Sequence, residues 1–297
     1  MGAILILGRN EDLCGQIVAE ALRRDGRKVL FLPEDQLLPE MSLAWTPADG
    51  GGGVRFRGQE ARFAELDGVL YRFYGMPLPA EEFQTQDGRY ICAEWNALFM
   101  AWLRPLPCPV INRLQPDLWY KTRLNVPALS ALMPDLPFAR PRILVTTRAE
   151  EARAFRRRLA GPVTYAALSG SAPYPIRDED DLEKLTALSG ALPLHLTEAL
   201  DGRAMEAFVV GNTVTLVGAD GTAAGSAPAS LVDRCLQVGT HLGLTFFQLS
   251  LVERAGGDWY CLALDRMPQL YACGPAAREE IVGHLVALLT GKGGQAA

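Results

Sequence analysis

The stretch "AILILGRNEDLCGQIVAEALRRDGRKVLFL" (residues 3–32) contains two short apolar runs on either side of an amphipathic segment. The runs at 3–7 and 28–32 predict two strands. The 3.6-residue period of 13–26, which stops at Gly26, predicts a helix between them. A strand, a helix and a second strand in this order predict a parallel sheet. The first turn, "GRNED", lacks the G-x-G-x-x-G pattern, so the dinucleotide fingerprint is absent.

The next segments extend this sheet. The glycine-rich "PADGGGGVRFRG" (47–58) predicts a hairpin tip between short strands, because the alternative, a phosphate-cradling turn, needs a helix start with Lys and Ser or Thr after it. "DGVLYRFYG" (67–75) predicts a third strand, and "PVINRL" (109–114) returns to the sheet. Between them, 89–106 predicts a long helix whose apolar face favours core packing over a partner-binding face.

The rest of the chain predicts mixed elements. From about 117 the pattern predicts a helix that carries Lys121, and the middle of the chain then becomes a run of strands after an extended 140–147 and a helix at 149–159. The last elements are a helix (229–242), two strands (246–254 and 258–270) and a closing helix (275–290). This order predicts a parallel α/β part first and mixed α and β elements after it.

Composition bounds the function. Hydrophobic residues make up 49% and charged residues 21% of 297 residues, and the longest apolar runs fall short of the about 18 residues of a membrane span. The N-terminus lacks the features of a signal peptide, so we expect a cytoplasmic protein without a membrane partner. A net charge of −5 argues against a nucleic-acid partner. The six cysteines are far apart, without C-x-x-C or zinc spacing, and predict buried free thiols.

Nucleophilic catalysis has little support. The sequence has no G-x-S-x-G motif, and His195, His241 and His284 are not placed in a way that indicates a triad. His195 alternates within a predicted strand and His284 lies on a predicted helix, so both are expected to be satisfied core or surface histidines.

Four longer stretches share a pattern with one enzyme superfamily. They are "VLYRFYGMP" (69–77), "PVINRLQPDLWYKTRLNVPAL" (109–129), "LHLTEALDGRAMEAFVVGNTV" (194–214) and "LGLTFFQLSLVERAGGDWYCLALDRMPQL" (242–270). Together with the order of elements, they resemble the ATP-grasp superfamily. Within it, the chain is most similar to the branch of ribosomal-protein-modifying glutamate ligases and of peptide maturases that close lactone and lactam rings.

The resemblance implies a fold, cofactors and partners. It implies an α/β N-terminal domain at 1–113, a lid-bearing α+β subdomain at 114–192 and a C-terminal α+β subdomain at 193–297, the last two of which hold ATP and Mg²⁺. It further implies transfer of the terminal phosphoryl group to a carboxylate and attack on the acyl-phosphate by an amine or hydroxyl. It also implies that an N-terminal domain recognises a leader peptide. Arg72, on the third predicted strand, and Glu94, on the long helix, occupy the matching places.

The positions implied for ATP are only partly kept. Lys121 lies where the family has a lysine that contacts phosphate or adenine, and Arg113 and Glu198 match other places near ATP. The second family lysine, in the lid strand, is replaced by Ala166. Where the family commonly has Asp-x-Arg, the register gives Ala204 and Glu206, which places a negative charge where a negative ligand would lie.

The positions implied for magnesium are altered in the same way. Ser250 replaces an Asp, Ala263 a Glu and Asp265 an Asn. Because magnesium sites in proteins normally need one or two carboxylates, Asp265 is the remaining candidate ligand. The alternative is a relocated site made by Glu206 with Glu253 and Asp258.

Two hypotheses follow. The first is a degenerate member of the ligase branch, a pseudoenzyme that binds a peptide, a small molecule or a partner biosynthetic enzyme in a bacterial modification pathway. The second is a working carboxylate–amine or carboxylate–hydroxyl ligase in which Lys121, Arg113, Glu198 and Asp265 form the residual ATP site. The substrate, and whether the chain forms a homo-oligomer, are left open.

Overall fold

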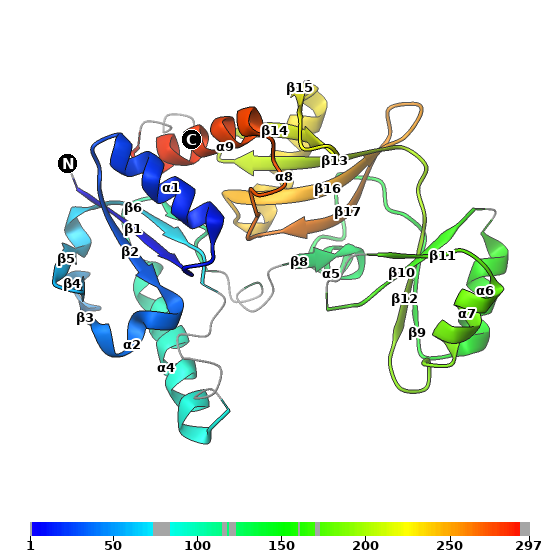
Figure 1. Ribbon diagram of the computed structural model, residues 1–297, viewed down its shortest axis with the longest axis horizontal. Coiled ribbons are helices and arrows are strands. Elements are labelled where there is room, and N and C mark those ends of the chain that lie inside the picture. The colour runs from blue at the N-terminus through cyan, green and yellow to red at the C-terminus, as the bar shows by residue number, and fades with distance from the viewer. Residues whose placement is uncertain are drawn as a thin grey trace. The chain divides into compact units, whose positions relative to one another are not determined.

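The computed structural model describes residues 2–73, 84–114, 118, 123–159, 161–169 and 173–291. The chain divides into two compact units (Figure 1). Unit 1 comprises Met1–Thr122, Ala207–Gln248 and Arg266–Ala297, and unit 2 comprises Arg123–Glu206 and Leu249–Asp265. The three-part division with boundaries after 113 and 192 stays a prediction.

The elements follow in a mixed order. The described α-helices are α1 (Leu13–Arg24), α2 (Leu37–Glu40), α4 (Gln86–Leu103), α5 (Val126–Leu132), α6 (Ala149–Arg158), α7 (Glu179–Thr186), α8 (Ala229–Leu242) and α9 (Pro275–Leu289). The described strands are β1 (Ala3–Gly8), β2 (Lys28–Pro33), β3 (Met41–Thr46), β4 (Gly51–Phe56), β5 (Gln59–Arg62), β6 (Leu66–Tyr71), β7 (Val110–Ile111), β8 (Arg123–Asn125), β9 (Ile143–Thr146), β10 (Val163–Ala166), β11 (Tyr174–Ile176), β12 (Leu194–Glu198), β13 (Arg203–Val210), β14 (Thr213–Gly218), β15 (Ala223–Ser226), β16 (Phe246–Glu253) and β17 (Trp259–Asp265).

Unit 1 contains the predicted parallel sheet. Its order is β2-β1-β6-β7, and each neighbouring pair is parallel. All six residues of β1 are buried, as expected for a strand covered on both faces. On one face, α1 packs against α9 (Figure 1). On the other, Phe99 and Trp102 of α4 join the core, which confirms that the apolar face of this helix is a packing face.

The glycine-rich segment forms the predicted hairpin. Strands β3 and β4 pair antiparallel across a turn at 47–50, so that β4 itself lies within this segment, and β5 completes a three-stranded sheet. Gly52 has φ of +122°, and a Cβ atom there would lie 2.0 Å from the carbonyl oxygen of Ala44. Since neither the backbone angle nor the space admits a side chain, glycine is required at this position.

Unit 2 is built around an antiparallel sheet of order β11-β10-β12-β9. Helices α6 and α7 pack on each other and cover it (Figure 1), with Phe155 and Leu182 in a core that also contains Leu196. Helix α7 corrects the prediction of an uninterrupted run of strands. Its signal is local, because the Asp178 side chain accepts a hydrogen bond from the N–H of Asp181 and caps the helix.

A six-stranded sheet of order β15-β14-β13-β16-β17-β8 completes the fold, and β13 and β16 each contribute residues to both units. The prediction of a helix from 117 onward is wrong at Arg123–Asn125, which is strand β8, paired antiparallel with β17. Helix α5 begins only after Asn125, whose side chain caps it, with Pro127 in the first turn. Lys121 lies outside the described residues.

Two further predictions concern the whole chain. All six cysteines are free and buried, which confirms the prediction of free thiols. Burial raises the pKa of the Cys14 thiol to about 11 and that of Cys235 to about 12. Among the described helices, none combines the length and the apolar character that crossing a membrane requires.

Candidate functional site

A cavity of about 370 Å³ lies inside unit 2. One wall comes from β10 and β12 of the antiparallel sheet. The other wall comes from β8, β13, β16 and β17. The cavity therefore lies between two sheets. Because side chains alternate between the two faces of a strand, residues two positions apart on a strand face the same side.

Four side chains of the first wall lie on one face of the sheet. The β10–β12 register places Thr164 opposite Thr197 and Ala166 opposite His195. Opposed residues of an antiparallel pair point to the same face, and all four line the cavity. This face carries hydroxyls and one imidazole but no charged cation.

His195 is the deepest polar group of this wall, with a relative exposure of 3%. Its Nε2 atom lies 3.2 Å from the hydroxyl oxygen of Thr197, and its Nδ1 atom is buried without a hydrogen-bond partner. Burial lowers the pKa of His195, because desolvation disfavours the charged imidazolium. The expectation of a satisfied core histidine is thus wrong for one of the two ring nitrogens.

The second wall carries a short polar chain. The Arg123 guanidinium donates to the Ser250 hydroxyl over 3.4 Å, and this hydroxyl donates to the Glu206 carboxylate over 3.0 Å. All three side chains line the cavity. Ser250 therefore links a cation on β8 to an anion on β13.

Glu198 lies at the edge of the cavity and is bound by an arginine from the strand next to it. Arg142 donates to its carboxylate through the backbone N–H at 3.2 Å and through Nε at 3.0 Å. These hydrogen bonds lower the pKa of Glu198. The carboxylate is thus anionic and already satisfied by the protein.

The structure brings together most of the positions that the resemblance singled out. Ala166, Glu198, Glu206, Ser250 and Ala263 come from five separate strands, and all five line this one cavity. Asp265 is not among its lining residues; it ends β17 opposite Arg123 of β8.

The donor set does not suit a magnesium nucleotide. Among the described residues that line the cavity there is no lysine, and the two carboxylates, Glu198 and Glu206, already accept hydrogen bonds from the protein. A triphosphate needs cations on its oxygens and carboxylates free to hold the metal. ATP and Mg²⁺ therefore do not fit the described part of this site.

The relocated metal site finds no support in the described residues. There, no group of three or more His, Cys, Asp or Glu side chains is close enough to hold a metal ion. Glu206 lines the cavity, whereas Glu253 and Asp258 are not among its lining residues.

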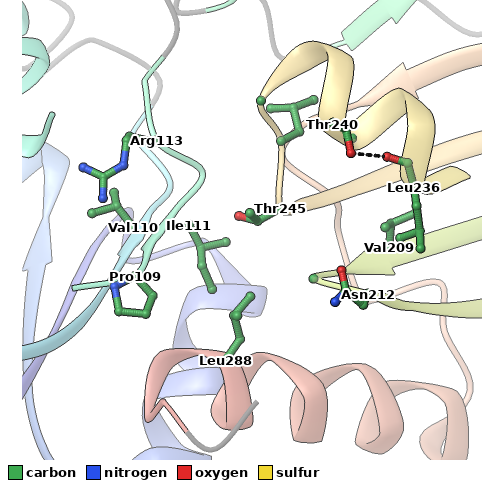
Figure 2. A pocket seen from close by; sticks show the side chains of 14 residues that line it. Pro109, Val110, Ile111, Arg113, Val209, Asn212, Leu236, Thr240, Thr245 and Leu288 are labelled. Atoms are coloured by element: carbon green, nitrogen blue, oxygen red, sulfur yellow. Dashed lines mark hydrogen bonds between the residues drawn. The ribbon is translucent and has the colours of Figure 1, made fainter. Parts of the chain in front are cut away.

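A second cavity, of about 460 Å³, lies in unit 1 and contains Arg113 (Figure 2). Figure 2 shows Arg113 beside Val110 of β7, with Thr240 of α8 and Leu288 of α9 on the other sides. The Arg113 guanidinium donates to four backbone carbonyls that follow or end α4, those of Leu103, Arg104, Leu106 and Cys108. Arg113 thus belongs to a different cavity from Glu198.

The two residues predicted to bind a leader peptide are in contrasting environments. Arg72 has a relative exposure of 1%, and its guanidinium pairs with the Asp12 carboxylate and donates to the carbonyl of Pro268. Glu94 is exposed on α4. The peptide-binding role of both stays a prediction.

Arg123, Asn125, Thr164 and His195 line the cavity with polar groups that were not identified as site residues from the sequence. Arg123 and Asn125 were not identified because a helix, and not strand β8, was predicted for their segment. His195 carried a usable signal, because it alternates with Thr197 in the otherwise apolar first half of a strand. Asn125 donates to the carbonyl of Leu168, so it also ties the segment after β10 to the start of α5.

Comparisons with known proteins place the fold. No protein-family model and no curated protein sequence matches the chain. Several solved structures match almost end to end, and three of them are described below. The macrocyclase MdnC of Microcystis aeruginosa MRC, bound with the precursor peptide MdnA, has a TM-score of 0.77 and 14% identity over 97% of this chain and 99% of its own.

The other two are similar in extent. A RiPP-associated ATP-grasp ligase of Chryseobacterium gregarium, in complex with ADP and a leader and core peptide, has a TM-score of 0.76 and 14% identity over 99% and 98% of the two chains. The ATP-grasp ligase PsnB, complexed with a precursor variant, Mg and ADP, has a TM-score of 0.75 and 21% identity over 98% and 97%. The order of elements, the sheets and these matches agree, and the chain therefore has the ATP-grasp fold seen in these precursor-peptide ligases.

Proposed function

We propose that this chain is a binding or partner protein of a peptide or natural-product modification pathway, and that it has lost standard ATP–Mg²⁺ catalysis. It would bind a peptide, a small molecule or a partner enzyme of that pathway. Support for the pathway comes from the fold, because the structures that match it are ligases solved with precursor peptides. Function resides in the site more than in the fold, so the cavity carries the proposal.

The observation that carries it is the lining of the unit 2 cavity. Ala166, Ser250 and Ala263 supply no charge, and Glu206 supplies a negative one. Phosphoryl transfer depends on preorganised positive charge around the phosphates. A carboxylate at the wall opposes the binding of a triphosphate instead of assisting it.

The second candidate is an active ligase with altered ligands. The guanidinium of Arg123 favours it, because this cation lines the same cavity and was not foreseen from the sequence. In this alternative Lys121 and Glu198 would contribute what remains of the ATP site, with Asp265 on the metal, whereas Arg113, which the resemblance also assigns to this site, lines the other cavity.

Calorimetric titration of ATP, with and without Mg²⁺, tests the proposal. A ligand at about 100 times its dissociation constant stabilises a protein by about 2.7 kcal/mol, so a thermal-unfolding scan gives a second readout. We expect no heat and no shift. Magnesium-dependent binding would favour the active ligase.

A gain-of-function variant tests whether the missing positive charge is what prevents ATP binding. Ala166→Lys combined with Glu206→Arg restores positive charge at two cavity positions, and we expect ATP binding to appear in this variant. A ligase already solved with ADP and Mg serves as the positive control. If the wild type and the double variant both fail to bind, these two positions are not what excludes the nucleotide.

A further inference from the structure

Arg123 is a cation that lines the unit 2 cavity and has no ion pair among the described residues. Its one hydrogen bond within the described residues is the 3.4 Å contact to the Ser250 hydroxyl, and no carboxylate of that part of the chain lies within 4.0 Å of its guanidinium. A guanidinium carries several N–H donors in a planar fork. Most of these donors are therefore available to a ligand.

The carboxylates of the same cavity do not neutralise this charge directly. Glu206 accepts its hydrogen bond from Ser250, which stands between it and Arg123. Glu198 is held by Arg142. The described lining of the cavity thus presents one positive group, together with anionic groups that are already hydrogen-bonded.

A second, independent observation comes from His195. The tautomer that is protonated on Nε2 donates to Thr197 and leaves Nδ1 as an acceptor, and this buried atom has no partner. A buried polar atom without a partner costs about 1–3 kcal/mol. A hydroxyl or N–H group of a ligand that reached Nδ1 would remove this cost.

The rest of the lining is mainly apolar. Its apolar side chains are those of Val126, Ala166, Ala167, Pro173, Ala199, Leu200, Val252, Leu262 and Ala263. Cavities of a few hundred Å³ with apolar walls and a few polar groups are typical small-molecule sites. The walls thus suit a compact apolar body with a polar group at each end.

We propose that this cavity is a metal-independent site for a small monocarboxylate with an apolar body. The carboxylate pairs with Arg123, and a hydroxyl or N–H group at the far end donates to Nδ1 of His195. A single negative charge matches the single guanidinium of the described lining, whereas a nucleotide triphosphate would bring several negative charges next to Glu206. This inference rests on the proposed loss of ATP–Mg²⁺ chemistry at the same cavity.

The test uses 3-(4-hydroxyphenyl)propionate as the probe, titrated calorimetrically into the full chain in the presence of EDTA. Two analogues are matched controls: 3-phenylpropionate lacks the hydroxyl, and 3-(4-hydroxyphenyl)propanamide lacks the charge. We expect saturable binding of the probe, weaker binding of both analogues, and no effect of EDTA.

Variants assign the contacts. Arg123→Gln should lower the affinity for the probe by about 10- to 100-fold and leave the affinity for the amide analogue unchanged. The reason is that only the carboxylate of the probe forms a charge-assisted hydrogen bond with Arg123. Arg157→Gln makes the same charge change on the exposed side of α6, away from the lining residues, and should change nothing. His195→Phe should abolish the difference between the probe and 3-phenylpropionate.

Circular dichroism verifies folding, and Arg123→Lys, which keeps the charge, replaces Arg123→Gln if that variant unfolds. Absence of saturable binding by the wild type overturns the inference, as does equal binding of acid and amide. Neither result contradicts the proposed function, which is contradicted only if ATP binds with Mg²⁺. Binding of ATP together with no binding of the probe would overturn both.

Discussion

His195, a buried residue of the cavity, makes the stability of the folded protein depend on pH. Its imidazole is desolvated, which lowers its pKa, and among the described residues its hydrogen-bond partner is the neutral Thr197 hydroxyl. The folded protein therefore keeps the imidazole neutral at a pH at which the unfolded chain, with its ordinary histidine pKa of about 6.5, takes up a proton. Acid thus favours the unfolded state at this residue.

We predict that the free energy of unfolding falls as the pH drops below about 6.5, and that His195→Gln makes this decline less steep. The unfolded state binds more protons than the folded state in this window, so stability rises with pH, with a limit of about 1.4 kcal/mol per pH unit for one proton. Urea unfolding at several values between about pH 5 and 8 measures it. His284→Gln, at a half-exposed histidine, is the control, and an identical slope for wild type and His195→Gln would contradict the prediction.

At the scale of elements, the end of α4 depends on a residue that is distant in sequence. The last carbonyls of a helix lack partners within the helix. Arg113 supplies donors to the carbonyls of Leu103 and Arg104, at 2.6 and 2.5 Å, and also binds those of Leu106 and Cys108. Its planar fork is thus the cap of α4.

We expect Arg113→Lys to lower the free energy of unfolding by about 1–2 kcal/mol, because an ammonium cannot reproduce the fork. Urea unfolding gives the value, and Arg104→Lys, at an exposed arginine of the same turn, should be neutral. A stable Arg113→Lys variant with altered ATP binding would instead support the nucleotide role implied by the resemblance.

Elements differed in how well the sequence predicted them. The βαβ opening and α8 have clear periodicity, and their positions were predicted closely. Strand β8 was not, because three residues are too few to show a period, and their extended form depends on pairing with β17. Helix α7 was missed although Asp178 and its acidic first turn gave a usable capping signal.

For the molecule as a whole, the two units share strands. The chain crosses from one unit to the other within β13 and within β16. Unfolding of unit 2 would therefore disrupt strands on which the sheet of unit 1 depends. Cooperative unfolding is expected where structural parts cannot lose order separately.

We predict a single urea transition, at which far-UV circular dichroism and tryptophan fluorescence coincide. A variant that keeps Trp259 of unit 2 as its only tryptophan, and a second that keeps Trp102 of unit 1, report on the two cores separately. Midpoints that differ between these two variants, after correction for their stabilities, would show that the units unfold independently.

The candidate site was predictable only in part. The resemblance selected Ala166, Glu198, Glu206, Ser250 and Ala263 from separate segments, and the structure gathers all five around one cavity. Arg113 lies in another cavity, and the contacts of Arg123 and His195 could not be foreseen. Hydrogen-bond partners of this kind join residues that are distant in sequence, and a pattern of residue types does not encode their geometry.

The parallel opening, the alternation of mixed elements and the uncharged side chains at Ala166 and Ala263 can all be read from the sequence. These depend on period, turn chemistry and residue type, which are local properties. Which buried polar groups have hydrogen-bond partners depends on the tertiary structure. Asn112 is the clearest case, since its amide donates to the carbonyls of Phe246 and Arg266 and accepts from the N–H of Thr245. A buried polar atom that lacks a hydrogen bond is costly, and burial arises only when the chain folds. Hydrogen bonds between residues this distant in sequence are therefore a property of the folded chain.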